Sequence, residues 1–282
     1  ASCLVGSEMC IRDRLFSLKY TTENQSMLPA IINTLLIALV ALLVAIPIGV
    51  GGAIYLAEYA KRNSPLVRTI RLTAETLQGI PSIIYGLFGM VFFTALQINL
   101  TLLSGALTLS LMVLPLILRT TEEALLSIPD SYREGSFGLG AGKLRTVFTI
   151  VLPSAMPGIL SGVILATGRI VGETAALIYT ASSVAKIPTS VFSSTRTLAV
   201  HMYLLSNEGL YIGQTYGTAV VLLVLVLLIQ RPTAWLALLA LVPIWLYRGR
   251  QGYHSKPFQY ACYAFYPVHM LVLVLALNFV NR

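Results

Sequence analysis

The sequence predicts an all-α fold, a bundle of helices that crosses a lipid bilayer several times. Of its 282 residues, 56% are hydrophobic and only 11% are charged, whereas charged residues make up about a quarter of a typical globular chain. The mean hydropathy is +0.81, and apolar runs long enough to cross about 30 Å of hydrocarbon recur along the chain. Because lipid cannot satisfy backbone N–H and C=O groups, spanning segments must be helices or a closed barrel, and these runs are too long for barrel strands.

Five membrane spans are predicted, and the residues between them set their orientation. The spans are expected at about residues 28–57, 73–96, 102–118, 157–179 and 216–229. Basic residues are retained on the cytoplasmic side of a membrane, which assigns the loops at 58–71 and 119–153 to the cytoplasm. Two spans separate these loops, so the assignment is self-consistent. The polar stretch at 181–213 has few basic residues and is expected outside.

Composition and spacing exclude several kinds of site. The net charge of +8 comes from basic residues beside the spans rather than from a nucleic-acid-binding patch. The three cysteines, Cys3, Cys10 and Cys262, have neither CxxC nor metal-ligand spacing. A glycine-rich phosphate loop ending in lysine is absent from the sequence. We therefore expect no catalytic residue, metal, cofactor or nucleic-acid partner, and any ATP must be hydrolysed by another chain.

The two ends of the chain differ in pattern from the part between them. Residues 1–14 have neither helical periodicity nor the apolar core of a signal peptide, and are interpreted as a non-native, artefact-like tail. If the short apolar run inside 231–282 crosses the membrane, three basic residues fall on the outside, against the positive-inside bias. We therefore expect one membrane domain at 15–230, joined near Gln230 to a foreign helical tail. An unusual C-terminal extension of the same protein is the alternative.

The segment at 134–153, EGSFGLGAGKLRTVFTIVLP, is a polar loop rich in glycine between two long apolar runs. A Pro-Asp pair ends the preceding helix, and Ser131 followed three residues later by Glu134 has capping-box spacing for a new one. Gly140 is expected to supply the left-handed residue that ends this short helix. A second amphipathic segment follows from about Lys143. The loop is therefore predicted to be a helix–turn–helix whose small residues let a partner approach closely.

The spacing in this loop resembles the EAA loop of ABC-importer permeases, the element that docks into the ATPase subunit. That pattern has a glutamate and two small residues, a glycine after three further residues, and Ile-x-Leu-Pro after nine more. The matching residues here are Glu134, Gly135, Ser136, Gly140, Ile150, Leu152 and Pro153. The resemblance implies that these residues couple the chain to an ATP-binding subunit.

Two further segments, at 77–89 and 162–181, resemble the PstA-type subunit of phosphate-specific ABC permeases, and those at 45–60 and 214–228 agree with them. The resemblance covers about residues 25–229. It implies a multi-pass subunit of an ATP-driven phosphate importer in the bacterial inner membrane, working with a homologous second permease, a pair of ATP-binding subunits and an external phosphate-binding protein. Closure of the ATPases would rock the spans between inward-open and outward-open states. Permeases of this family have six spans, so the first is expected to be incomplete here.

Arg169 is the main candidate for contact with the cargo. It lies about twelve residues into the fourth predicted span, close to the middle of the membrane, where a lone charge costs at least about 2.5–3.5 kcal/mol on insertion scales. Its fork of donors matches the tetrahedral oxygens of phosphate. Glu173, four residues on, is expected on the same helical face and can pair with it. A purely structural pair between Arg169 and Glu173 is the alternative.

A break in the second predicted span supplies weaker candidates. Pro81, with Gly79, interrupts the hydrogen bonding of the helix, and the freed backbone groups would line a cavity as in broken transporter helices. Ser82 and Tyr85 are weaker candidates for the same path. A kink that serves only close packing is the favoured alternative.

The segment at 259–277 supports a different interpretation, because it resembles the TraX-like membrane acyltransferases. In a membrane-bound acyltransferase His269 would be the base, although a histidine beside Pro267 at the end of a span is also typical of an interfacial anchor. A non-functional chimeric product is the third interpretation. Binding of an ATPase subunit would favour the permease, and acyl transfer would favour the enzyme.

Overall fold

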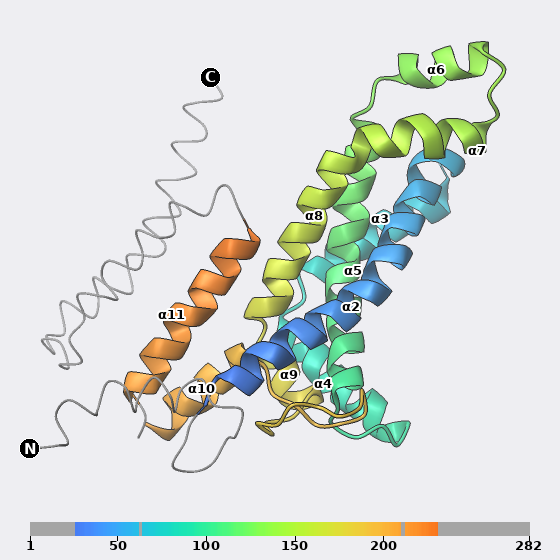
Figure 1. The fold of residues 1–282 in the computed structure, drawn as a ribbon. Helices are drawn as coiled ribbons and strands as arrows, with labels where there is room; N and C mark the ends of the chain where they lie inside the picture. The colour runs from blue at the N-terminus through green and yellow to red at the C-terminus, as the bar shows by residue number, and fades with distance from the viewer. Residues whose placement is uncertain (1–25, 62–63, 210–211, 231–282) are drawn as a thin grey trace, which may run out of the picture. The chain divides into compact units, whose positions relative to one another are not determined.

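The computed structural model describes residues 26–61, 64–209 and 212–230, and within these ranges every regular element is helical (Figure 1). The elements in chain order are α2 (Leu28–Ile54), the π-helical turn η1 (Tyr55–Tyr59), α3 (Pro65–Gln78), α4 (Ser82–Ala95), α5 (Leu102–Leu126), α6 (Asp130–Gly138), α7 (Lys143–Thr146), the π-helical turn η2 (Val147–Val151), α8 (Leu152–Gly172), α9 (Ala175–Thr180), α10 (Leu198–Glu208) and α11 (Ile212–Ile229). The predicted all-α membrane fold is confirmed. The interpretations of residues 1–14 and 231–282 concern segments outside the described residues.

Three described helices are long and apolar enough to cross a membrane, and the bent pair of α3 and α4 makes a fourth if it is one span. The first of them, Leu28–Tyr59, confirms the first predicted span. Helix α5 begins at Leu102 as predicted, but it continues to Leu126, beyond the expected end at residue 118. Its last turns look like a loop in the sequence because they are charged. In the structure Arg119 pairs with Glu123 along the helix at 2.9 Å.

The second predicted span is wrong as one continuous helix. Helices α3 and α4 are bent by 103° relative to each other, and α3 begins at Pro65, earlier than expected. Pro81 causes the break because it has no N–H to donate to the carbonyl of Leu77, four residues before it. That carbonyl accepts the hydroxyl of Tyr85 at 2.8 Å and the N–H of Ile80 at 3.3 Å instead. Tyr85 and Ile80 together thus satisfy the carbonyl that the helix leaves free at its bend.

The fourth predicted span, 157–179, is wrong at both ends. The helical run begins at Lys143 and passes through η2 into α8, so Pro157 lies inside a helix rather than before one. At the other end α8 stops at Gly172, and Glu173 is extended, with φ −74° and ψ 129°. The short helix α9 follows as a separate element. The sequence Ala175–Thr180 is as apolar as a span, so composition gave no sign of this interruption.

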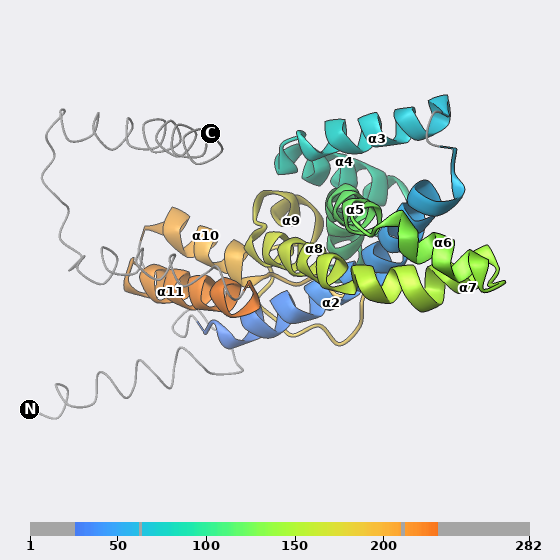
Figure 2. The ribbon, with the colours of Figure 1, turned by 90° about the horizontal axis from the view of Figure 1, so that it is seen from above.

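Helix α5 is the centre of the described bundle, and it packs against α2, α3, α4, α8 and α9. Figure 2 shows α3 and α4 on one side of α5, with α2 and α8 on the other. The helices approach closely where glycine faces the neighbour. A Cβ at Gly158 of α8 would lie 2.7 Å from the Cβ of Ala124 of α5. Such small-residue contacts are how helices associate in lipid, where dispersion and close packing replace the hydrophobic effect.

Candidate functional site

The segment between α5 and α8 forms a hairpin of two short helices, α6 and α7, which we call the coupling hairpin (residues 130–146) and which lies at one end of α5 (Figure 1). Gly140 follows the end of α6 with φ +82°, as predicted. Its N–H donates to the carbonyl of Phe137 at 2.9 Å, and the N–H of Ala141 donates to the carbonyl of Ser136 at 3.1 Å. These two bonds form a Schellman motif, which satisfies carbonyls at the end of the helix.

The start of α6 differs from the expected capping box. The helix begins at Asp130, with Pro129 as its N-cap and no side-chain capping bond. Ser131 therefore lies inside the first turn, where its hydroxyl cannot take the capping position. The negative charge of Asp130 in this first turn interacts favourably with the positive end of the helix dipole.

The residues of the predicted EAA-like pattern divide into two groups. Glu134, Gly135 and Gly140 are exposed on the coupling hairpin, and a Cβ at either glycine would meet no other atom within 4 Å. Packing within the chain therefore gives no reason for a small residue at 135. Ser136 is buried, and its Oγ lies 2.8 Å from Oγ1 of Thr146, which ties α6 to α7.

The second group belongs to the start of the next span rather than to the hairpin. Ile150 lies in η2, while Leu152 and Pro153 begin α8. Ile150 and Leu152 are half-buried and Pro153 is exposed. Pro153 lies inside the continuous helical run from Lys143 to Gly172, directly after the π-helical turn, and its ring nitrogen removes one donor from the helix at that point.

Sequence reasoning missed a buried ion pair beside the hairpin. Nη2 of Arg133 in α6 lies 2.7 Å from Oε1 of Glu58 in η1, and the two side chains are 14% and 7% exposed. The same guanidinium donates to the carbonyls of Ile128 at 2.8 Å and Leu125 at 3.0 Å. One signal was present in the sequence: Glu58 is the only acidic residue in the basic stretch 58–71.

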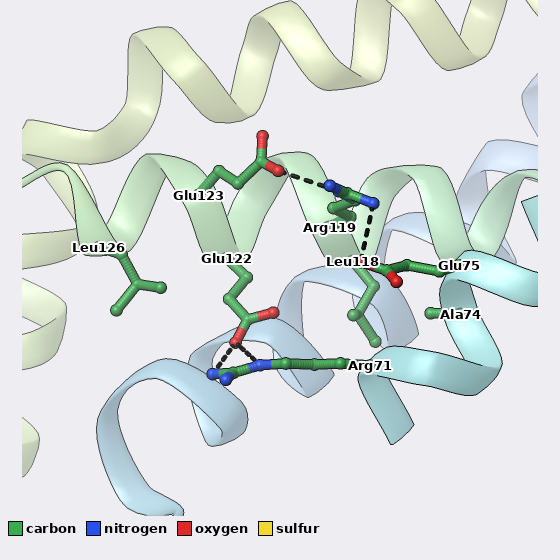
Figure 3. Close-up of a pocket in the computed structure, with 8 residues that line it drawn as sticks. All are labelled: Arg71, Ala74, Glu75, Leu118, Arg119, Glu122, Glu123 and Leu126. Carbon is green, nitrogen blue, oxygen red and sulfur yellow. Dashed lines mark hydrogen bonds and ion pairs between the residues drawn. The ribbon is translucent and has the colours of Figure 1, made fainter. Parts of the chain in front are cut away.

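A second group of charges lies between α3 and α5 around a pocket of about 150 Å³ (Figure 3). Arg71 reaches Glu122 at 2.6 Å, and Arg119 bridges Glu75 at 3.2 Å and Glu123 at 2.9 Å. Each of these five charged groups has a partner of opposite sign. The ion pairs around the pocket therefore hold α3 against α5. Arg119, which was expected in the loop after the third span, belongs to helix α5.

The expected pair of Arg169 and Glu173 does not form. Arg169 lies in the last turn of α8, near the end of the span rather than in the middle of the membrane as expected, because the helical run begins earlier, at Lys143. The helix ends before Glu173, so the two residues do not share a helical face. Oε1 of Glu173 accepts the N–H of Ala176 at 3.1 Å instead. No carboxylate in the described ranges forms an ion pair with Arg169.

Among the described residues no hydrogen bond or ion pair joins Arg169 to the break between α3 and α4, so a shared path at these two places stays a prediction. Tyr85 bonds across the break through its hydroxyl. Pro81 is exposed and Ser82 half-buried, and α4 starts at Ser82. The backbone N–H groups of this first turn have no partners within the helix and carry the positive end of its dipole. The first turn of α4 is thus a second source of positive potential, besides Arg169 on α8.

Comparison with protein families gives a match over most of the described chain. The family model described as the binding-protein-dependent transport system inner membrane component matches residues 45–238. That match extends past Gln230, and the boundary expected there stays a prediction. No metal-binding cluster of His, Cys, Asp or Glu occurs among the described residues.

Curated relatives and solved structures agree with this match. The chain is 36% identical over 221 residues to the probable ABC transporter permease protein YqgI of Bacillus subtilis, covering 72% of this chain and 75% of the relative. It is 35% identical over 215 residues to the phosphate transport system permease protein PstA 1 of Mycobacterium tuberculosis, covering 75% and 70%. An inward-facing structure of the MetNI methionine ABC transporter matches with a TM-score of 0.57 at 24% identity, covering 70% of this chain and 86% of that one. At this identity the structure supports the fold alone.

Proposed function

Because this chain belongs to the family of inner membrane components of binding-protein-dependent transport systems, the permease subunits of ABC importers, we propose that it carries phosphate across the bacterial inner membrane. The observation that best supports the coupling part of this proposal is the coupling hairpin. It is ordered by its own Schellman motif at Gly140 and exposes Glu134 and Gly135 without any packing need for glycine. A surface of this kind suits close approach by the groove of an ATP-binding subunit.

Phosphate is the proposed cargo because an anion fits the positive charge of Arg169 and the positive end of the dipole of α4. The relatives described as phosphate transport system permease proteins, including that of Yersinia pestis at 35% identity, point in the same direction. Among the described residues Arg169 has no acidic partner, so its donors are open to an anion. The guanidinium of Arg169 and the first turn of α4 at Ser82 are both suited to oxyanions.

The proposed assembly contains two permeases, two ATP-binding subunits and an external phosphate-binding protein. Closure of the ATPases would push the coupling hairpin, and the spans would rock between inward-open and outward-open states. The exposed apolar face of α4, which includes Phe88 and Phe92, would lie against lipid or the second permease.

The test is ATP-dependent uptake by the complete complex in vesicles that contain the external binding protein. We expect uptake of labelled phosphate in preference to sulfate, and a loss of about tenfold or more for Arg169→Gln, because hydrogen bonds to a charged group contribute about 1.5–3 kcal/mol. Arg169→Lys should keep part of the uptake, since it retains the charge but not the fork. If the unchanged complex takes up no phosphate, the proposed cargo is wrong.

Glu173→Gln is the matched control for this test. The amide oxygen of glutamine still accepts the N–H of Ala176, and Glu173 holds no ion pair with Arg169. We therefore expect near-normal uptake for Glu173→Gln. Equal loss in Arg169→Gln and Glu173→Gln would support a structural pair and remove Arg169 from the cargo path.

A further inference from the structure

Arg133 connects three elements through one guanidinium. Its Nη2 contacts Glu58 at the end of η1, and the same nitrogen and Nη1 donate to the carbonyls of Leu125 in α5 and Ile128 just after it. Leu125 is among the last residues of α5, whose carbonyls have no partner within the helix. Arg133 itself belongs to α6, so the coupling hairpin is attached by this side chain to the ends of two spans.

The position of Glu58 connects the hairpin to the first described span. Helix α2 and η1 form one continuous run from Leu28 to Tyr59, so Glu58 lies at the very end of the first described span. The coupling hairpin is joined by the chain itself to α5 and α8 only. Its packing is mainly on η2, and the link to the first span runs through side chains.

A second contact joins the coupling hairpin to the first described span. Nζ of Lys143, the first residue of α7, lies 5.1 Å from the centre of the ring of Tyr59. The elements that meet the hairpin, η1 and η2, are both π-helical turns. This form is rare in proteins, and where it does occur it often lies at a functional site. The hairpin therefore meets the first span through one buried ion pair and one cation–π contact.

We propose that Arg133 and Glu58 form a positioning pair that transmits displacement of the coupling hairpin to the first described span, α2. This inference rests on the proposed coupling to an ATPase. The pair is nearly dry, so separating its charges during transport is costly, and the two groups move together. Without the pair, the hairpin would keep only the cation–π contact of Lys143 with Tyr59 as its direct link to the first span, and displacement would otherwise reach α2 only indirectly, through its packing on α5 and α8.

The test uses the complex of the full chain with its ATP-binding subunits, and it measures phosphate transported per ATP hydrolysed. Glu58→Gln keeps the shape of the side chain and removes the buried charge that faces Arg133, which then keeps only its exposed ion pair with Asp130 within α6, at 3.1 Å. We expect ATP-binding subunits to remain bound and ATP hydrolysis to continue, while phosphate per ATP falls at least about fivefold, the lower end of typical coupling between two sites. Glu58→Asp, which keeps the charge, should recover part of the ratio.

Glu122→Gln is the matched control. Glu122 is buried to the same degree, 8% against 7%, and it faces Arg71 in an ion pair that does not involve the hairpin. Its loss should lower thermal stability and abundance but leave phosphate per ATP unchanged. If Glu58→Gln also changes only stability and abundance, the pair is a brace and the inference is overturned.

Two further outcomes keep the inference separate from the proposed function. If the unchanged chain binds no ATP-binding subunit, the proposed function fails before the pair is tested. If Glu58→Gln does not accumulate, the double variant Glu58→Gln with Arg133→Gln replaces it, because neither charge is then left buried without its partner. An unchanged ratio of phosphate per ATP in the double variant would overturn the positioning role.

Discussion

Replacing Gly140 by valine perturbs the backbone of the coupling hairpin without crowding it. A Cβ at Gly140 would meet no atom within 4 Å, so the whole cost arises from its φ of +82°. A residue with a Cβ in the left-handed region costs about 1–2 kcal/mol, and a β-branched one is a clear outlier there. The alternative, leaving that region, breaks the two bonds of the Schellman motif, which contribute about 0.5–1.5 kcal/mol each.

Either cost lowers the population of the hairpin conformation that docks. A shift of about 1.4 kcal/mol is a factor of ten, and the apparent affinity for a partner falls by the same factor as the competent population. We therefore expect Gly140→Val to weaken binding of the ATP-binding subunit by up to about tenfold and to reduce phosphate uptake, while the protein remains in the membrane. The assay is titration of purified ATP-binding subunit onto the permease in detergent.

Gly142→Val is the matched control in the same loop. Gly142 is extended, with φ −72° and ψ 159°, which any residue adopts, and a Cβ there is also free of contacts. Gly140→Asn is the second control, because asparagine tolerates the left-handed region. Both should bind nearly as well as the unchanged chain. Unchanged binding by Gly140→Val, or an equal loss in Gly142→Val, would refute the argument from backbone conformation.

Two further predictions concern other parts of the chain. His201, on α10 outside the membrane spans, is fully buried, and burial together with Arg196 lowers its pKa to about 3. The histidine of the unfolded chain takes up a proton below its ordinary pKa of about 6.5, so the free energy of unfolding should fall by up to about 1.4 kcal/mol per pH unit from there down toward pH 3. The melting temperature should therefore depend less on pH in His201→Gln, and an unaltered dependence would contradict this. Truncation after Gln230 should leave phosphate uptake unchanged, because Gln230 still packs at Gly168 of α8, and a loss of uptake would show that residues 231–282 act in transport.

The parts of the site that could be predicted from the sequence are those with local causes. Gly140 was identified because the end of a short helix needs one left-handed residue, and that need depends on a few neighbouring residues. The start of α5 at Leu102 is similarly local, since Thr101 and Ser104 form a capping box. The break at Pro81 was foreseen for the same reason, but not its 103° bend. The angle depends on where α3 and α4 find packing partners.

The parts that could not be predicted depend on contacts between distant residues. Arg133 and Glu58 are 75 positions apart, and nothing in the spacing of either residue indicates the other. The end of α8 was missed because the residues after Glu173 are as apolar as the helix before them. A close contact decides that position: a Cβ at Gly86 of α4 would lie 2.8 Å from the Cα of Ala176, so α9 packs on α4 as a separate helix.

The contrast between Arg133 and Arg169 separates two uses of arginine in this membrane protein. Arg133 faces Glu58 and two carbonyls, which compensate the loss of water around its charge. Arg169, in the last turn of α8, has no such acidic partner in the part of the chain that the structure describes. A carboxylate paired with Arg169 would compete with an incoming oxyanion for the donors of the guanidinium. The absence of that carboxylate is therefore what the proposed phosphate path requires, and the bond between Glu173 and Ala176 is what keeps the nearest candidate away.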